Sequence, residues 1–466
     1  MDALIVIFLS GLISLFVAFA KKPLYVLVTA SVGLLTAAGL LLHQLFNLGH
    51  YLSSDVVNPH TLFSYQGLAF NDASTISYSL VAILFTFLSV LAGYKSFKSE
   101  EEHTGDYIGL LLFSLTGALC MVSFTDMFMF FLGLEILSIP IYVLAGSKKK
   151  DTGSSEASLK YFLMGAFATG VLLFGIAWVY GATKSFDLNQ IAMAINNGEG
   201  ETSLMYVGIL LILCAFLFKV GAAPFHFWGP DVYDGSPSVI TGFMASVVKL
   251  AAFGAFIKLF GTIFIGLHDF WAPALMVLAI ITMFIGNLSA ISQVKFKRLL
   301  AYSSITHVGY ALLTILTEGN NNEMNLLFYL FSYGFSVLAL ITISMILEDK
   351  EDRLEAFKGL AKRNPILGFI AVLALLSLAG VPPLVGFFGK YLVFSSAFAQ
   401  YPTLVIIAIA NSGIGIYYYL KTVMTVISKE EIAETPASLS ISTLQWVVLA
   451  ACAFGLIFGG CFVSYF

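Results

Sequence analysis

The sequence is short of charge. Asp, Glu, Lys and Arg together make up only 11% of its 466 residues, whereas 59% of the residues are hydrophobic. A soluble globular domain carries about 25% charged residues, so this composition excludes a water-soluble fold. The formal net charge is only −4, and no long basic run or aromatic-basic interleaving occurs. We therefore expect membrane lipid as the surroundings of the chain and no nucleic-acid partner.

Cysteine is also scarce, and the four cysteines are isolated within apolar runs. They show neither CxxC spacing nor a His-rich neighbourhood, which excludes an Fe–S ligand run and a haem-attachment motif. The sequence has no GxGxxG turn after a strand and no P-loop. We therefore expect this chain to bind no cofactor and no metal, and any energy that it uses to come from elsewhere.

Long apolar runs dominate what remains, and a membrane helix needs about 20 such residues. Runs of this length, bounded by charge, Gly or Pro, predict an all-α polytopic membrane protein that forms a single membrane domain over 1–466. About fourteen transmembrane helices are predicted, at 3–20, 24–46, 76–94, 107–123, 126–145, 159–181, 203–220, 238–265, 270–291, 298–317, 324–347, 366–399, 402–427 and 444–464.

The loops between these helices differ strongly in basic residues, which are retained on the cytoplasmic side of a membrane. If the N-terminus is outside, the outside loops contain Lys184 alone. The inside loops then contain Lys21, Lys22, Lys95, Lys98, Lys148, Lys149, Lys150, Lys295, Lys297, Arg298, Lys350, Arg353, Lys358, Lys362, Arg363 and Lys429. This asymmetry predicts that both termini lie outside, which in a bacterial inner membrane is the periplasmic side; an organellar membrane is the alternative.

Two of the predicted helices, the seventh and the twelfth, are interrupted by Gly and Pro, at 221–224 and at 380–386. Proline removes a backbone donor and clashes with the preceding turn, so both helices should be broken. The breaks lie five helices apart, which gives the broken helices opposite directions, as in inverted-topology repeats. We predict one repeat of helices 4–8 over 107–265 and a second of helices 9–13 over 270–427. Three N-terminal helices in 1–106 precede them, and a C-terminal helix at 444–464 follows.

Five ionisable residues lie deep in these helices, although a charge at the centre of a membrane costs about 2.5–3.5 kcal/mol. Such residues usually line a hydrated or protein-enclosed path. They are Glu135 in helix five, Lys219 at the break of helix seven, Lys249 in helix eight, His307 in helix ten and Lys390 in helix twelve.

Glu135 and Lys219 could form a switchable proton site, because burial disfavours a charged amine and a nearby carboxylate favours it. Lys249, His307 and Lys390 would then extend this site as a lateral relay through water. The alternative is a structural ion pair that locks helix five to helix seven. A single carboxylate cannot neutralise three deep lysines, and this favours the proton path.

The other charged residues near helix ends predict simpler roles. Lys258 and Lys421 are expected to extend their amines to the membrane surface, and so is Lys160, which could alternatively supply a cytoplasmic entry. Asp126 and the pair at 231 and 234 are expected to be solvated loop or cap residues.

The segment from Lys219 to Pro237, KVGAAPFHFWGPDVYDGSP, followed by Lys249, resembles the antiporter-like membrane subunits of the proton-pumping NADH:quinone oxidoreductase, respiratory complex I. The resemblance spans essentially the whole chain. It implies that Glu135, Lys219, Lys249 and Lys390 correspond to the family's proton-path residues on helices five, seven, eight and twelve. A second lysine on helix eight, Lys258, leaves open which helix-eight site faces the path.

The same resemblance implies a proton path driven at a distance by quinone reduction in other subunits. NADH, FMN, Fe–S clusters and quinone would be bound there, and the membrane partners would be M-like and small K- and J-like subunits. The family is also similar to subunits of multi-component sodium/proton antiporters and membrane-bound hydrogenases, which are the alternative assignments. A third possibility is a scaffold whose charges only hold helices together.

Overall fold

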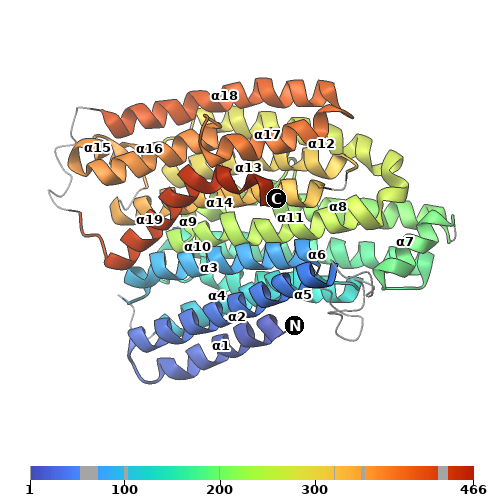
Figure 1. Cartoon of the computed structure of the whole chain (residues 1–466), viewed down its shortest axis with the longest axis horizontal. Coiled ribbons are helices and arrows are strands. Elements are labelled where there is room, and N and C mark those ends of the chain that lie inside the picture. Colours follow the sequence, from blue (N-terminus) through green and yellow to red (C-terminus); the bar gives the residue numbers. More distant parts are fainter. Residues whose placement is uncertain are drawn as a thin grey trace. The chain divides into compact units, whose positions relative to one another are not determined.

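The computed structural model describes residues 2–52, 72–98, 103–198, 200–319, 321–347, 352–428 and 439–465, and these are almost entirely helical (Figure 1). Twelve helical segments in this part of the chain are long and apolar enough to cross a membrane. The predicted all-α polytopic fold is therefore confirmed. Of the basic residues used to predict the topology, Lys350 and Lys429 lie outside the described residues.

The first half of the chain forms helices that follow the predicted apolar runs closely. They are α1 (Asp2–Ala18), α2 (Pro23–Leu52), α3 (Ala73–Lys98), α4 (Thr104–Ser123), α5 (Met127–Ala145), α6 (Thr152–Thr183), α7 (Leu188–Asn196), α8 (Thr202–Val220), α9 (Trp228–Gly235), α10 (Ser238–Phe243), the π-helix η3 (Met244–Val248), α11 (Lys249–Lys258), the π-helix η4 (Leu259–Ile263) and the 3₁₀-helix η5 (Ile265–Leu267). The short helices α7 and α9 and the two π-helical segments were not predicted.

The second half has the same character. Its helices are α12 (His268–Ile291), α13 (Phe296–Leu316), α14 (Asn322–Leu347), the 3₁₀-helix η6 (Leu354–Phe357), α15 (Leu360–Arg363), α16 (Pro365–Ala379), α17 (Val385–Phe398), α18 (Pro402–Ile427), α19 (Thr443–Phe458) and the 3₁₀-helix η7 (Gly459–Tyr465). Of the fourteen predicted spans, the two outside the twelve long segments correspond to α1 and to the successive helices α16 and α17.

The chain divides into two compact units, one formed by 1–144, 165–216 and 247–271 and the other by 145–164, 217–246 and 272–466. In the first unit, α4 and α5 pack with their backbones in close contact. A side chain at Gly117 would meet the backbone nitrogen of Leu137 at 2.1 Å, and the Ser114 hydroxyl donates to the Leu137 carbonyl at 2.8 Å. Small residues at such a crossing are typical of membrane helices, because close backbone packing replaces the hydrophobic effect there.

In the second unit both predicted helix breaks are present. The first follows α8, where Gly221 adopts a φ of +78°, and the second follows α16, where Gly380 adopts a φ of +85°. Glycine suits both positions because positive φ is strained for other residues. The assignment of helices 4–8 and 9–13 to two inverted repeats stays a prediction.

Candidate functional site

Lys390 lies on α17, one turn after the second break, and is only 7% exposed. Its ammonium donates to the Ala379 carbonyl oxygen at 2.9 Å, a group left without an intrahelical partner where α16 ends, and to the Ser412 hydroxyl at 2.9 Å. The same nitrogen lies 5.5 Å from the ring centroid of Tyr310. The break therefore supplies a carbonyl ligand that holds the buried amine in place.

His307 lies on α13 and is 6% exposed, and both ring nitrogens face tyrosine hydroxyls. Nδ1 is 2.6 Å from the Tyr329 hydroxyl, and Nε2 is 3.1 Å from the Tyr419 hydroxyl, which also contacts the Ser303 hydroxyl. A hydroxyl can donate or accept, so either tautomer of the imidazole finds partners on both sides. This arrangement allows the imidazole to exchange a proton without losing its contacts.

A chain of amides and hydroxyls lies between these two residues. The Tyr310 hydroxyl donates to Asn411 Oδ1 at 3.1 Å, and Asn287 Nδ2 donates to the same oxygen at 2.6 Å. The Tyr418 hydroxyl then donates to Asn287 Oδ1 at 2.9 Å, and the ring of Tyr418 packs on that of Tyr419. The second unit thus places a buried group of tyrosine and asparagine side chains between Lys390, which faces the Tyr310 ring, and His307, which contacts Tyr419. A relay through these residues stays a prediction.

Lys219 lies in the last turn of α8, is 6% exposed and belongs to the same unit. Carbonyl and amide groups released by the break beside it are satisfied by distant side chains. Trp228 Nε1 donates to the Phe218 carbonyl oxygen at 3.0 Å, and the Ala223 amide donates to the Thr282 hydroxyl at 3.0 Å. The break that ends α8 after this lysine is therefore stabilised by side chains.

Glu135 and Lys249 belong to the first unit. Glu135 lies in the middle of α5, and its Oε1 is buried without a hydrogen-bond partner among the described residues. Lys249 opens α11 immediately after the π-helical turn η3 and is 7% exposed. The predicted pairing of Glu135 with Lys219 stays a prediction. Lys258, the second lysine of α11, was expected to extend its amine to the membrane surface; this is wrong, because its Nζ is buried and lies 5.1 Å from the ring centroid of Phe124.

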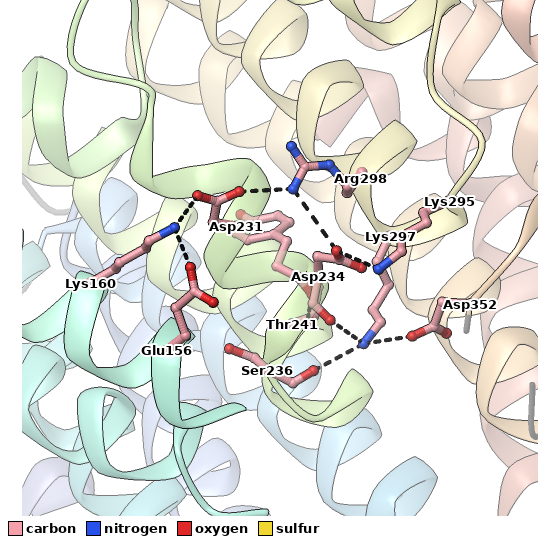
Figure 2. Close-up of polar contacts among 11 residues, drawn as sticks. Glu156, Lys160, Asp231, Asp234, Ser236, Thr241, Lys295, Lys297, Arg298 and Asp352 are labelled. Atoms are coloured by element: carbon pink, nitrogen blue, oxygen red, sulfur yellow. Dashed lines mark hydrogen bonds and ion pairs between the residues drawn. The ribbon is translucent and has the colours of Figure 1, made fainter. Parts of the chain in front are cut away.

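A second group of charges, which the sequence did not reveal, joins α6, α9 and α13 in the second unit (Figure 2). The Asp231 carboxylate accepts from Lys160 Nζ at 2.7 Å and from Arg298 Nη1 at 2.8 Å. Lys160 also pairs with Glu156 at 2.6 Å, and Asp234 pairs with Lys295 at 3.0 Å. Asp231 and Asp234, predicted as solvated loop or cap residues, instead hold basic side chains.

The most buried member of this group is Lys297, whose side chain is 3% exposed. Its ammonium lies 2.8 Å from the Asp352 carboxylate and donates to the carbonyl oxygens of Asp234 and Ser236 at 2.8 and 3.1 Å (Figure 2). All three donor positions of the amine can therefore be used. This lysine fixes the end of α9 to the start of α13.

These ion pairs keep Asp231 ionised. Burial raises the pKa of its carboxyl group, but the hydrogen bonds from Lys160 and Arg298, together with their charges, bring that pKa below its usual range. The carboxylate therefore keeps its charge at neutral pH. We infer that this group of charges holds helices together, whereas the residues around His307 and Lys390 are suited to proton exchange.

Buried amines, an imidazole and hydroxyls in a polytopic helical bundle define an ion-conducting membrane subunit of the antiporter-like class, and comparison with known proteins agrees. The family model described as "NADH:quinone oxidoreductase/Mrp antiporter, TM" matches residues 125–415. NADH-quinone oxidoreductase subunit N of Cytophaga hutchinsonii is 40% identical over 93% of this chain and 92% of its own length. A chain of respiratory complex I from Thermus thermophilus is 30% identical with a TM-score of 0.80, covering 99% of this chain and 98% of that one.

The chain therefore belongs to the NADH:quinone oxidoreductase/Mrp antiporter family of membrane subunits. A chain of the Mrp complex from Dietzia sp. has a TM-score of 0.82 over 100% of this chain and 96% of its own, but at 21% identity it shows the shared fold alone. NADH-quinone oxidoreductase subunit N of Flavobacterium psychrophilum is 36% identical over 92% of this chain and 92% of its own length.

Proposed function

We propose that this chain is the N-type, proton-translocating membrane subunit of an NADH:quinone oxidoreductase. The observation that supports it best is the buried group of hydroxyls and amides that lies between Lys390 and His307. If these residues only held helices together, apolar side chains would serve at a lower cost in free energy, because each buried polar group needs a hydrogen-bond partner. Imidazole and hydroxyl groups can both donate and accept, which suits them to passing protons, whereas the amides of Asn287 and Asn411 hold the neighbouring tyrosine hydroxyls in place.

In the proposed path, Glu135, Lys219, Lys249, His307 and Lys390 each hold a proton in turn. Tyrosine and serine hydroxyls pass protons on by rotating about their C–O bonds, and water bridges the remaining gaps. The carbonyl groups freed at the two helix breaks can hold such water. The Glu135 and Lys219 pair is proposed as the switch, because the separation of these charges sets which of the two groups is ionised.

The proposal extends to the cofactors, the partner subunits and the location of the chain. The chain itself would bind no cofactor, and NADH, FMN, Fe–S clusters and quinone would be held by other subunits that supply the redox energy. Its membrane neighbours would be an M-like subunit and small K- and J-like subunits. The complex would lie in the cell inner membrane, with both termini of this chain on the periplasmic side, as the distribution of basic residues supports.

The experiment that tests the assignment is gentle purification of the tagged chain, identification of co-purifying chains by mass spectrometry, and an NADH:quinone activity assay. Flavin and Fe–S subunits with NADH-dependent activity are expected. Small antiporter chains without redox subunits, together with sodium-dependent transport that ignores NADH, would instead make the chain part of a cation/proton exchanger. A hydrogenase complex would be recognised by hydrogen-dependent activity.

The hydroxyl of Tyr419 provides a specific test of the proposed relay. Tyr419→Phe removes the group that contacts both His307 Nε2 and Ser303 while leaving the buried ring in place. We expect proton pumping to fall about tenfold, as an added barrier of about 1.4 kcal/mol would produce. The measurement is the initial rate of NADH-driven acidification in proteoliposomes. Tyr417→Phe, on the exposed side of the same helix, is the control and should pump normally. Equal rates for the two variants would remove Tyr419 from the path.

A further inference from the structure

A cavity of about 590 Å³ lies in the second unit where α12 ends, α13 begins and the last turns of α18 pass. Three basic side chains line it, those of Lys295, Arg353 and Lys421, whereas Glu355 is the one carboxylate in its lining. The Asp234 carboxylate pairs with Lys295 at 3.0 Å. Counting that carboxylate as well, the basic groups remain in excess, so the cavity favours an anion.

The backbone forces two of these basic residues together. Lys295 and Arg353 face each other across an antiparallel bridge, held by a hydrogen bond from the Leu354 amide to the Val294 carbonyl oxygen at 2.9 Å. Side chains directly opposite each other across such a pair lie on the same face. The bridge therefore holds two basic side chains at one edge of the cavity.

Lys421 adds the third positive charge from α18. Its side chain is exposed, and it lies six residues before the end of α18 at Ile427, which is about 9 Å along the helix axis. No ion pair or side-chain hydrogen bond of its amine is found within the described ranges of the chain. This amine is therefore available to an anion that enters the cavity from the membrane surface.

The remaining surroundings distinguish a phospholipid from a free anion. Leu299, Leu354 and Tyr418 form apolar parts of the cavity wall. Val294, at the edge of the cavity, is 73% exposed, and Met424 on α18, outside the lining, is 64% exposed. A small inorganic anion would make no favourable contact with these apolar surfaces, whereas the acyl chains of a lipid would cover them. The basic loops place this end of the helices on the cytoplasmic side, where anionic lipids gather.

We propose that this cavity binds the phosphate headgroup of an anionic phospholipid of the cytoplasmic leaflet, with its acyl chains along α12 and α18. Lys421 and Arg353 contact the phosphate. Lys295 stays paired with Asp234 and attracts the phosphate through its positive charge without contacting it. This site is independent of the proton path, so its test does not depend on pumping.

The test uses the purified complex in liposomes that contain phosphatidylglycerol with a photoactivatable diazirine in its acyl chain. After illumination, mass spectrometry quantifies labelled peptides from 288–294 and 417–427. The double variant Arg353→Gln/Lys421→Gln is expected to lose label about fivefold for each charge removed. The matched control is Lys148→Gln/Lys149→Gln, which removes the same charge from exposed positions outside the cavity and should be labelled like the parent.

Two further arms identify the ligand. Phosphatidylcholine with the same diazirine should label these peptides weakly in every variant. An excess of inorganic phosphate should not compete with the labelled lipid, since phosphate lacks acyl chains. Equal labelling by the two lipids, or no change in the double variant, would overturn the proposal. Displacement by inorganic phosphate would make this a free-phosphate site, and absence of label in the parent complex would mean that another chain covers the cavity.

Discussion

Replacing Lys219 by Met is expected to stop proton pumping. It should also slow NADH:quinone turnover, because electron transfer that is coupled to proton transfer cannot proceed when the proton path is blocked. The substitution keeps an unbranched side chain, one atom shorter, and removes the proton-carrying amine. Lys219 is 6% exposed beside the break that follows α8, so no surface group can replace it. A loss of pumping of about tenfold or more, measured as NADH-driven acidification in proteoliposomes, corresponds to at least about 1.4 kcal/mol.

This variant also separates a proton path from a scaffold. If Lys219 only holds helices together, Lys219→Met should lower the amount of assembled complex, and the complex that does form should pump normally per molecule. If the amine carries protons, the complex assembles and pumping per molecule falls. Lys148→Met, at an exposed loop position, is the control. A fully assembled Lys219→Met complex that pumps at the rate of the control would contradict the proposal, and the Glu135→Gln variant should give the same answer.

Lys297→Met is expected to destabilise the chain by about 3–5 kcal/mol, the usual cost of removing one member of a buried ion pair. The lost amine removes the basic partner of the half-buried Asp352 carboxylate, which keeps the hydrogen bond from Ser344, and a donor to the carbonyl oxygens of Asp234 and Ser236. Loosening of α9 from α13 should follow. The measurement is the midpoint of thermal unfolding of the purified complex, together with its yield.

The neighbouring lysine provides the matched control. Lys295 also pairs with a carboxylate, that of Asp234, but its side chain is 44% exposed. Pairs on the surface contribute about 0–1 kcal/mol, so Lys295→Met should change the unfolding midpoint little. Equal shifts in the unfolding midpoint of the two variants would show that burial does not make the ion pair of Lys297 contribute more to stability than that of Lys295.

The helices could be predicted well from the sequence because every membrane span needs the same local feature, a run of about 20 apolar residues. Each predicted span overlaps a helix of the structure, and both breaks fall where Gly and Pro interrupt the apolar runs. Proline and positive-φ glycine act through their own backbone, so neighbouring residues suffice to place them. The short helices α7 and α9 were missed because they are too short and too polar to resemble a span.

The charged cluster could not be predicted in the same way, because its partners are far apart in sequence. Lys160 and Arg298 reach Asp231 from 71 and 67 residues away, and no spacing rule relates them. The one available signal was topological, since the predicted loops placed all these charges on the same side of the membrane. The polar network around His307 was hidden for a different reason: tyrosine and asparagine in apolar runs carry no charge that sets them apart.

The π-helical turn η3, which ends at Val248 immediately before Lys249, has a consequence for how the chain tolerates insertions and deletions. A π-turn holds one residue more than the α-helical turn that it replaces. Deleting one residue from 244–248 would let the segment return to α-helix without lengthening the span. Because the shorter α-helical turn covers nearly the same rotation, α11 would keep its orientation relative to α10, whereas a return to α-helix without the deletion would rotate it by about 100°, one residue at 3.6 residues per turn. The π-helical turn therefore absorbs one residue without turning Lys249, so a chain with a single-residue gap here would still point this buried amine in nearly the same direction.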